Sequence, residues 1–313
     1  MNPLIVGLSA ILLGRNLSVQ APAWQPSPGH TQEPIWPGVP PHALQTRGAE
    51  VATTSDHLVA GKPWTYVRNV SQPTLTVYSP KGNNTGAAIV VFPGGGYQIL
   101  AIDLEGTEVC DWLTSTGITC VLLKYRVPNS GPSWDQFCGC DRNTRSSMPL
   151  EDAQRTLGLV RFHAAAWHIN PHKIGVLGFS AGGHLVAAVS TRFDRRVYPP
   201  VDAADQESSR PDFAVALYPG HLFDSGTSAL NSDIHATRTT PPTFLVQAEN
   251  DNVDDVSNSL IYYSALKSAG VRAELHLYAE GGHAFGLRQT KLPVTGWPRL
   301  VETWLQTIGM ISP

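Results

Sequence analysis

A serine flanked by glycines, Ser180, lies in the run GFSAGG at positions 178–183. The apolar run KIGVLGF leads into it as an expected strand, and the run GHLVAAVS continues from it as an expected helix. A G-x-S-x-G motif between a strand and a helix is typical of a strained turn that lifts a nucleophilic hydroxyl above the edge of a sheet. Gly178 and Gly182 leave the space that this turn needs. The motif predicts Ser180 as a nucleophile; a tight glycine turn with an incidental serine is the alternative.

A serine hydroxyl becomes reactive only with a base within hydrogen-bond reach. The chain has 11 histidines, and His283 stands in the loop EGGHAFG directly after the last expected strand. Its flanking glycines indicate that the imidazole approaches another backbone segment. His184 is the main rival, but a helix starting at Ser180 would point its side chain away from the hydroxyl. We therefore predict His283 as the base and interpret His184 as a packing or supporting residue.

A carboxylate is expected between Ser180 and His283 in the chain, since hydrolases with this serine motif keep the order Ser, Asp, His. Acidic residues follow the expected strand 242–248, and ligand sites of α/β proteins form at the carboxyl ends of parallel strands. Asp251 lies inside the turn and is predicted to orient the imidazole. Asp254 and Asp255 are closer to the next helix, where we expect charge–dipole partners of its N-terminus.

The loop PGGGY at positions 93–97 follows another expected strand. Its glycines allow backbone N–H groups to point inward, and with the N–H of Ala181 they would bind an oxyanion. A phosphate cradle is the other use of such a loop, but neither G-x-G-x-x-G nor G-K-[ST] occurs here. Tyr97 is a candidate wall for an acyl group or sugar, with simple packing as the alternative. Trp134, in the polar segment 127–147, is a weaker candidate for stacking on a sugar than for covering a satellite core.

Strands and helices alternate along the rest of the chain, which predicts a mostly parallel sheet with right-handed crossovers and helices on both faces. Several strands are apolar throughout, as expected when both faces are covered. Apolar residues recur at helical spacing from Leu150 to Trp167 and from Leu300 to Ile308. The expected strands are TLTVYS (74–79), AAIVVF (87–92), TCVLLKY (119–125), KIGVLGF (173–179), DFAVALY (212–218), PTFLVQA (242–248) and AELHLYA (273–279).

Composition narrows the class of protein. The 313 residues suffice for one large α/β domain, and the net charge of −3 favours neither nucleic acid nor an anionic membrane. The four cysteines have neither CxxC nor zinc-ligand spacing and are too few for a disulfide scaffold. The sequence leaves their pairing open: Cys110, Cys120, Cys138, Cys140.

The N-terminus begins with an apolar run that is too short to span a bilayer, followed by small residues at Ala21 and Ala23. This pattern predicts a signal peptide at 1–23 and a secreted or periplasmic protein; an apolar terminus without that role is the alternative. Many prolines follow up to about residue 45, which favours an extended strap. No other segment is expected to cross a membrane.

With these residues assembled, the chain resembles the bacterial acetyl-xylan-esterase-like carbohydrate esterases of the α/β-hydrolase superfamily, in the hormone-sensitive-lipase-like and feruloyl-esterase-like branch. The resemblance covers nearly everything after residue 23. This sequence differs from the family pattern in two places. One is Gln247-Ala248, where the family usually has His-Gly or His-Thr, and the other is the run of residues after Asp251. The matching segments are PIWPGVPP, VFPGGGY, EGTEVCDWLTSTGITCVLLKYRVP, PLEDAQRTLGLVR, IGVLGFSAGGH, PPTFLVQAENDNV, AELHLYAEGGHAFGLR and PVTGWPRLVETWL.

The resemblance implies an α/β-hydrolase fold, with a catalytic domain at 74–313 after a Pro-rich strap at 24–73. It implies a serine esterase that removes short acyl groups, often acetyl, from carbohydrate such as xylan, without metal or organic cofactor. The family roles fall on Ser180 as nucleophile, Asp251 as orienting acid and His283 as base. The matching oxyanion donors are Gly95, Gly96 and Ala181.

Three alternatives stay open at this point. A general short-chain carboxylesterase would use the same residues without a preference for polysaccharide, and is the closer rival. A serine exopeptidase would share the triad, although such relatives usually carry a large gating domain. A non-catalytic binding protein on the same fold would generally have lost part of the triad. Small esters or acylated carbohydrate are the expected partners, and the sequence does not indicate an oligomeric state.

Overall fold

The computed structural model describes residues 23–44, 46, 48–128, 134–135, 140–141 and 147–312, without the side chains of 134, 135, 140, 141 and 147. The predicted signal peptide therefore lies outside the described residues except for its last position, and so does Cys138. In the part of the chain that is described, no helix has both the length and the apolar character that a membrane crossing requires.

An eight-stranded sheet forms the centre of the molecule, in the order β1-β4-β7-β5-β10-β11-β14-β15. The six strands from β7 to β15 pair in parallel, while β4 runs antiparallel to β7 and β1 antiparallel to β4. All seven strands expected from the sequence are present, and the prediction of a mostly parallel sheet is confirmed. The strands are β1 Glu33–Pro34, β4 Thr74–Tyr78, β5 Ala88–Phe92, β7 Thr119–Lys124, β10 Ile174–Phe179, β11 Ala214–Leu217, β14 Thr243–Ala248 and β15 Ala273–Tyr278.

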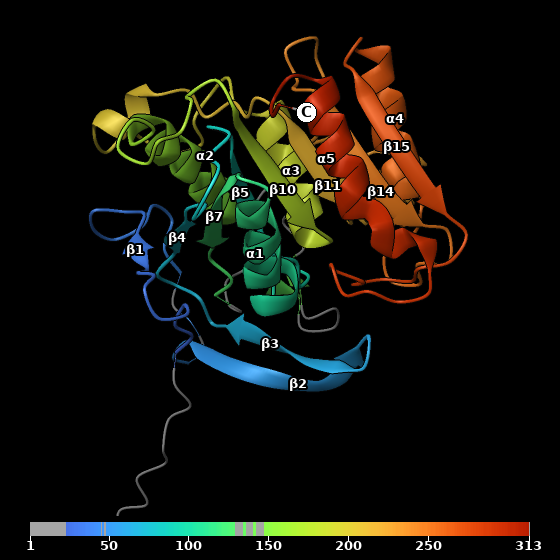
Figure 1. Cartoon of the computed structure of the whole chain (residues 1–313), viewed down its shortest axis with the longest axis horizontal. Helices are drawn as coiled ribbons and strands as arrows, with labels where there is room; N and C mark the ends of the chain where they lie inside the picture. Colours follow the sequence, from blue (N-terminus) through green and yellow to red (C-terminus); the bar gives the residue numbers. More distant parts are fainter. Residues whose placement is uncertain are drawn as a thin grey trace, which may run out of the picture.

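Helices cover both faces of this sheet (Figure 1). On the face turned toward the viewer, α1 and α5 lie side by side, and Trp112 of α1 packs edge-on against Trp297 of α5 at 5.2 Å between ring centroids. The other face carries α2 and α3. The helices are α1 Glu108–Ser115, α2 Ser147–Phe162, α3 Ala181–Thr191, α4 Ser257–Ser268 and α5 Trp297–Thr307; short helical turns are Asp103–Thr107, Ala203–Gln206 and Pro293–Gly296.

Burial explains why these segments take these forms. Every residue of β5, β7, β10, β11 and β14 is buried, so their uninterrupted apolar runs are covered on both sides. In α5 the buried residues are Trp297, Val301, Trp304 and Leu305, the spacing of one helix face. Burial of this apolar surface is the main source of stability for a domain of this size.

Residues 24–73, expected as a Pro-rich strap, contribute three strands that the sequence did not predict. Besides β1, an antiparallel hairpin of β2 and β3 runs beneath the sheet at the bottom of Figure 1. Its third strand is β6, which directly follows the glycine-rich loop at 93–97. The hairpin thus supports the glycine-rich loop through its pairing with β6. The bounds are β2 Val51–Val59, β3 Lys62–Arg68 and β6 Ile99–Leu100; the remaining short strands are β8 Trp134–Asp135, β9 Cys140–Asp141, β12 Phe223–Asp224 and β13 Ala229–Leu230.

A disulfide joins Cys110 in α1 to Cys120 in β7, with the two Cα atoms 5.1 Å apart. The sequence left the pairing of the cysteines open. Both residues are fully buried in the core, so the bond ties the helix to the strand that it covers. A cross-link of this kind constrains the unfolded chain and stabilises the native state.

Candidate active site

Ser180 occupies a sharp turn between β10 and α3. Its backbone has φ 51° and ψ −119°, a conformation that a residue with a side chain adopts only when its surroundings impose it. The surroundings here are glycines: a Cβ at Gly178 would lie 2.2 Å from the carbonyl oxygen of Gly182, and a Cβ at Gly182 would lie 2.1 Å from that of Phe92. The strand and the helix can approach only because both positions lack side chains.

Replacing Gly182 by alanine is therefore expected to destabilise the fold by about 3 kcal/mol, the upper range for forcing extra volume into a packed site. The clash is with backbone atoms, which cannot rotate away. Urea unfolding monitored by tryptophan fluorescence measures the change. Gly38→Ala is the matched control, since a Cβ at Gly38 meets nothing within 4 Å. Equal stability of the two variants would contradict this description of the turn.

Three side chains meet at the turn. The Nε2 atom of His283 lies 3.0 Å from the Oγ atom of Ser180, and its Nδ1 atom lies 2.8 Å from Oδ2 of Asp251. The Asp251 side chain is fully buried, whereas 13 % of the His283 side chain is exposed. A carboxylate can only accept, so it takes the proton of Nδ1 and leaves Nε2 free to accept from the serine. This arrangement can draw a proton from a serine hydroxyl.

The loop after β14 positions the carboxylate. Oδ1 of Asp251 accepts the backbone N–H groups of Val253 and Asp254 at 2.9 and 3.0 Å, which fixes the side chain within its own turn. Asn250 connects the same turn to the histidine loop, because its Oδ1 atom accepts the N–H groups of Gly281 and Gly282 at 3.0 and 2.8 Å. The positions of acid and imidazole are thus coupled through one short segment.

The glycine-rich loop lies against the serine from the opposite side. A Cβ at Gly94 would lie 3.0 Å from the Cβ of Ser180, and Gly95 and Gly96 adopt φ values of 132° and 61°. These left-handed conformations explain why glycine stands there. Among the described residues, no acceptor is recorded for the N–H groups of Gly95, Gly96 and Ala181. These three N–H groups stay candidate donors, and their oxyanion role stays a prediction.

Glu105 supports this loop and was not expected from the sequence. Its buried carboxylate accepts the N–H of Gly94 at 2.7 Å and the hydroxyl of Tyr218 at 2.8 Å. Burial raises the pKa of Glu105, although these two hydrogen bonds and the charge of His283 oppose the rise. The only signal in the sequence was its place in the segment EGTEVC, and nothing in that segment indicates a carboxylate turned toward the glycine loop.

His184, Tyr97 and Trp134 were the other residues singled out. The Nδ1 atom of His184 lies 2.7 Å from the Tyr97 hydroxyl, so its imidazole is engaged away from the serine, and burial lowers its pKa to about 3. Tyr97 also contacts the rings of Tyr125 and His221. Its role as a wall for substrate stays a prediction. The backbone of Trp134 lies in β8, but its side chain is outside the described residues.

Asp254 corrects one expectation. Its carboxylate is not a partner of the helix N-terminus: Oδ2 accepts the Ser180 hydroxyl at 3.2 Å and lies 3.8 Å from Nε2 of His283. Asp255, by contrast, does face the helix, since it accepts the N–H of Ser257, the first residue of α4, at 2.8 Å. The loop turns between these two neighbours, so one carboxylate faces the serine and the next faces the helix.

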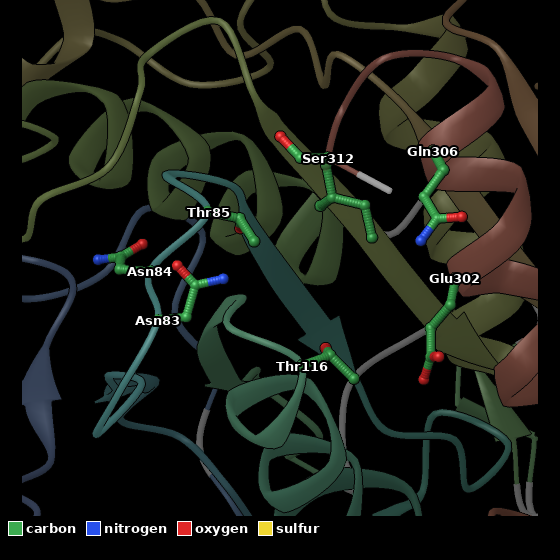
Figure 2. Close-up of a pocket in the computed structure, with 8 residues that line it drawn as sticks. Asn83, Asn84, Thr85, Thr116, Glu302, Gln306 and Ser312 are labelled. Atoms are coloured by element: carbon green, nitrogen blue, oxygen red, sulfur yellow. The ribbon is translucent and has the colours of Figure 1, made fainter.

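A separate cavity of ≈ 500 Å³ lies at the other end of the sheet (Figure 2). It is lined by Thr85, which comes shortly before β5, and by Thr116, shortly before β7, so it opens at the amino ends of the parallel strands. Ser180 follows the carboxyl end of β10, which is parallel to β5. The cavity is therefore distinct from the serine site. Its other lining residues are Asn83, Asn84, Glu302, Gln306, Ile311 and Ser312.

Comparison with known proteins agrees with this fold. Residues 143–287 match the family model described as the alpha/beta hydrolase fold. The structure of an acetyl ester-xyloside bifunctional hydrolase from Caldicellulosiruptor lactoaceticus superposes with a TM-score of 0.68 at 31% identity, covering 90% of this chain and 97% of that one. The acetylxylan esterase of Xylanibacter ruminicola is 33% identical over 250 residues, and the endo-1,4-beta-xylanase B of Butyrivibrio fibrisolvens is 24% identical over 245 residues.

These two curated relatives are longer than this chain. Each match covers 72% of this chain, but only 45% of the esterase and 36% of the xylanase. The chain thus spans less than half the length of either. The match to the family model, by contrast, spans residues 143–287 and so includes Ser180, Asp251 and His283.

Proposed function

Since this chain belongs to the α/β-hydrolase family, in its acetylxylan-esterase-like branch, we propose that it is a serine esterase that removes short acyl groups, above all acetyl, from carbohydrate. One observation carries the proposal: Ser180, His283 and Asp251 form a continuous hydrogen-bonded series of 3.0 and 2.8 Å beside a loop with available N–H groups. Two relatives, an acetylxylan esterase and an acetyl ester-xyloside bifunctional hydrolase, support acetylated xylan as the substrate class.

The first chemical step forms an acyl-enzyme. His283 takes the proton of Ser180 as its oxygen attacks the ester carbonyl, and the carboxylate of Asp251 stabilises the resulting imidazolium. The carbonyl oxygen becomes an oxyanion, which the N–H groups of Gly95, Gly96 and Ala181 bind. Glu105 contributes by holding Gly94 in place, so the donors do not have to reorganise during the reaction.

The first step ends when the tetrahedral intermediate collapses to the acyl-enzyme and His283 gives its proton to the departing sugar oxygen. The second step releases the acyl group. Water attacks the acyl-enzyme and gives a proton to His283, and His283 then returns that proton to the Ser180 oxygen as the carboxylic acid leaves. In each half of the reaction the imidazole first accepts a proton at Nε2 and then gives it up, so it must be neutral at the start of both halves.

This requirement predicts the acid limb of the pH profile. Burial disfavours the imidazolium of His283, but the hydrogen bond and charge of Asp251, followed by the charges of Asp254 and Glu105, outweigh it and raise its pKa above the ordinary 6.5. A protonated imidazole cannot accept the serine proton, so kcat/KM is expected to fall as the pH drops through a midpoint above 6.5. A profile of kcat/KM for 4-nitrophenyl acetate measures it; a midpoint below 6.5 would contradict the assignment.

The substrate class is tested by measuring acetate release from acetylated xylan beside hydrolysis of 4-nitrophenyl acetate. The proposal predicts that wild type releases acetate from xylan and that Ser180→Ala releases none above background. Hydrolysis of the small ester alone would leave the serine chemistry intact but favour a general short-chain carboxylesterase. Cleavage of a peptide amide would instead favour an exopeptidase.

A further inference from the structure

Ser180 faces two acceptors rather than one. Its Oγ atom lies 3.0 Å from Nε2 of His283 and 3.2 Å from Oδ2 of Asp254, and those two acceptors are 3.8 Å apart. A hydroxyl has one proton and donates it to one acceptor at a time. In the reactive arrangement the proton points to Nε2, because that is where it is transferred. The carboxylate of Asp254 then loses the donation from Ser180.

That loss matters because Asp254 has few other donors. Within the described part of the chain, the Ser180 hydroxyl is the one hydrogen-bond donor recorded for its carboxylate, and only 15 % of the side chain is exposed. A poorly solvated carboxylate without a donor costs free energy. Burial also raises the pKa of Asp254, although the charges of His283 and His221 oppose the rise. The raised pKa reflects the same cost, because burial disfavours the charged carboxylate. A substrate that brings a donor to this place would remove the penalty.

The carboxylate is held where it is by its backbone. The N–H of Asp254 donates to Asp251 at 3.0 Å, and its carbonyl accepts the Nε2 group of Gln247 at 2.5 Å. Gly220 provides the space for the side chain, since a Cβ there would lie 2.4 Å from Oδ1 and 2.5 Å from Oδ2 of Asp254. The N–H of Gly220 in turn donates to the carbonyl of Ser180 at 3.2 Å. The carboxylate thus has a prepared position beside the serine.

We propose that Asp254 is a specificity-determining residue that accepts a hydrogen bond from a hydroxyl group next to the esterified oxygen of the substrate. The inference rests on the proposed esterase function and names its preferred substrates as monoesters of vicinal diols. Sugars acylated at one of two neighbouring hydroxyls belong to this class, whereas esters of simple alcohols do not.

The position of the leaving oxygen supports this choice. That oxygen must come close to Nε2 of His283 to receive its proton. In a vicinal diol ester, the free hydroxyl is attached to the adjacent carbon, so it lies a short distance to one side of the leaving oxygen. Oδ2 of Asp254 is 3.8 Å from Nε2, within reach of such a hydroxyl. The substrate hydroxyl then replaces the serine hydroxyl as donor at the moment when the serine proton leaves.

The experiment compares two acetates of nearly equal size. In 2-hydroxyethyl acetate the alcohol carries a neighbouring hydroxyl, and in propyl acetate a methyl group stands in its place. We expect wild type to prefer the hydroxyl compound by about tenfold or more in kcat/KM, as sites built around a substrate hydroxyl reject analogues without it. A third substrate, 2-methoxyethyl acetate, offers no proton and should react like propyl acetate.

Variants connect the preference to one carboxylate. In Asp254→Ala the ratio of kcat/KM for 2-hydroxyethyl acetate over propyl acetate is expected to fall to about one. Gly220→Ala, which displaces the carboxylate without removing it, should lower the ratio as well. Asp255→Asn is the matched control, because its oxygen can still cap α4, and it should keep the wild-type ratio. Rates are measured on the pH plateau. A changed pKa of His283 in a variant would alter kcat/KM for both substrates by the same factor, so it leaves their ratio unchanged.

The outcomes separate this inference from the function on which it rests. A wild-type ratio near one with Ser180-dependent hydrolysis of both acetates would overturn the role of Asp254 and leave the esterase intact. A preference that persists in Asp254→Ala would also overturn the role of Asp254, since another group would then bind the substrate hydroxyl. Absence of Ser180-dependent hydrolysis of either acetate would instead refute the esterase itself.

Discussion

Replacing Ser180 by alanine is expected to reduce kcat for 4-nitrophenyl acetate by about 10⁶-fold, the loss seen when the nucleophile of a serine triad is removed. In the proposed mechanism the hydroxyl is the attacking group, and His283 cannot compensate because its Nε2 atom is placed to accept a proton from that position. Hydrolysis by purified variant and wild type, followed at equal concentration, gives the ratio. The remaining rate would reflect oxyanion binding without a nucleophile.

The same variant should stay folded, with a lower stability only to the extent that Asp254 loses its donor. The change removes a single oxygen from a nearly buried side chain and leaves the glycine-permitted turn unchanged. Circular dichroism and the urea midpoint therefore serve as controls for folding. A stable Ser180→Ala protein that retains more than about a tenth of the wild-type kcat would show that another group attacks the ester, against an expected loss of about 10⁶-fold.

Asp251→Asn is expected to lower kcat by about 10⁴-fold while preserving the shape of the loop. The amide oxygen can still accept the N–H groups of Val253 and Asp254, as Oδ1 of Asp251 does. The amide nitrogen would face Nδ1 of His283 as a donor, so the imidazole would carry its proton on Nε2 and could not accept from the serine. Steady-state kinetics on the pH plateau measure the effect.

Two controls accompany that variant. Unfolding in urea separates a catalytic loss from a loss of folded protein. Asp255→Asn removes a neighbouring negative charge outside the site and is expected to stay within about threefold of wild type, as for surface changes away from the reacting atoms. A loss of less than about tenfold in Asp251→Asn, where 10⁴-fold is expected, would mean that another carboxylate orients the imidazole.

The sequence was informative wherever one local pattern determines one structure. The seven strands of the main sheet have apolar runs that only a doubly covered strand requires, and the turn at Ser180 needs glycines at fixed positions. The pair β2 and β3 was missed because its residues are mostly exposed or half-buried, so neither a continuous apolar run nor a clear alternation marks them. Its place depends on pairing with β6, far along the chain.

The details of the site depend on tertiary contacts that no motif encodes. Asp254 and Asp255 are adjacent acids in one loop, and no sequence pattern distinguishes them. The space at Gly220 admits one carboxylate to the serine, while the other caps α4. Glu105 faces the glycine loop because the helical turn 103–107 follows β6, which is itself anchored to the hairpin. The disulfide likewise required the packing of α1 on β7.

The proposed role of Asp254 gives a physical reason for selectivity among esters. In the proposed mechanism, Ser180, His283 and Asp251 would hydrolyse any short ester that reaches them, so they do not by themselves distinguish a sugar ester from an alkyl ester. A carboxylate beside the leaving oxygen does distinguish them, since only the sugar brings a neighbouring donor. The substrate ratio in Asp254→Ala therefore bears on selectivity, whereas Ser180→Ala bears on catalysis.

Covalent labelling is the most direct measurement of the central claim, which is that Ser180 is the nucleophile. The protein would be treated with a fluorophosphonate, which reacts with activated serines, and its intact mass and digested peptides determined. We expect one adduct per chain, on the peptide that contains Ser180, formed in step with the loss of esterase activity and absent from Ser180→Ala. Inactivation with the adduct on another residue, or full labelling of Ser180→Ala, would contradict it.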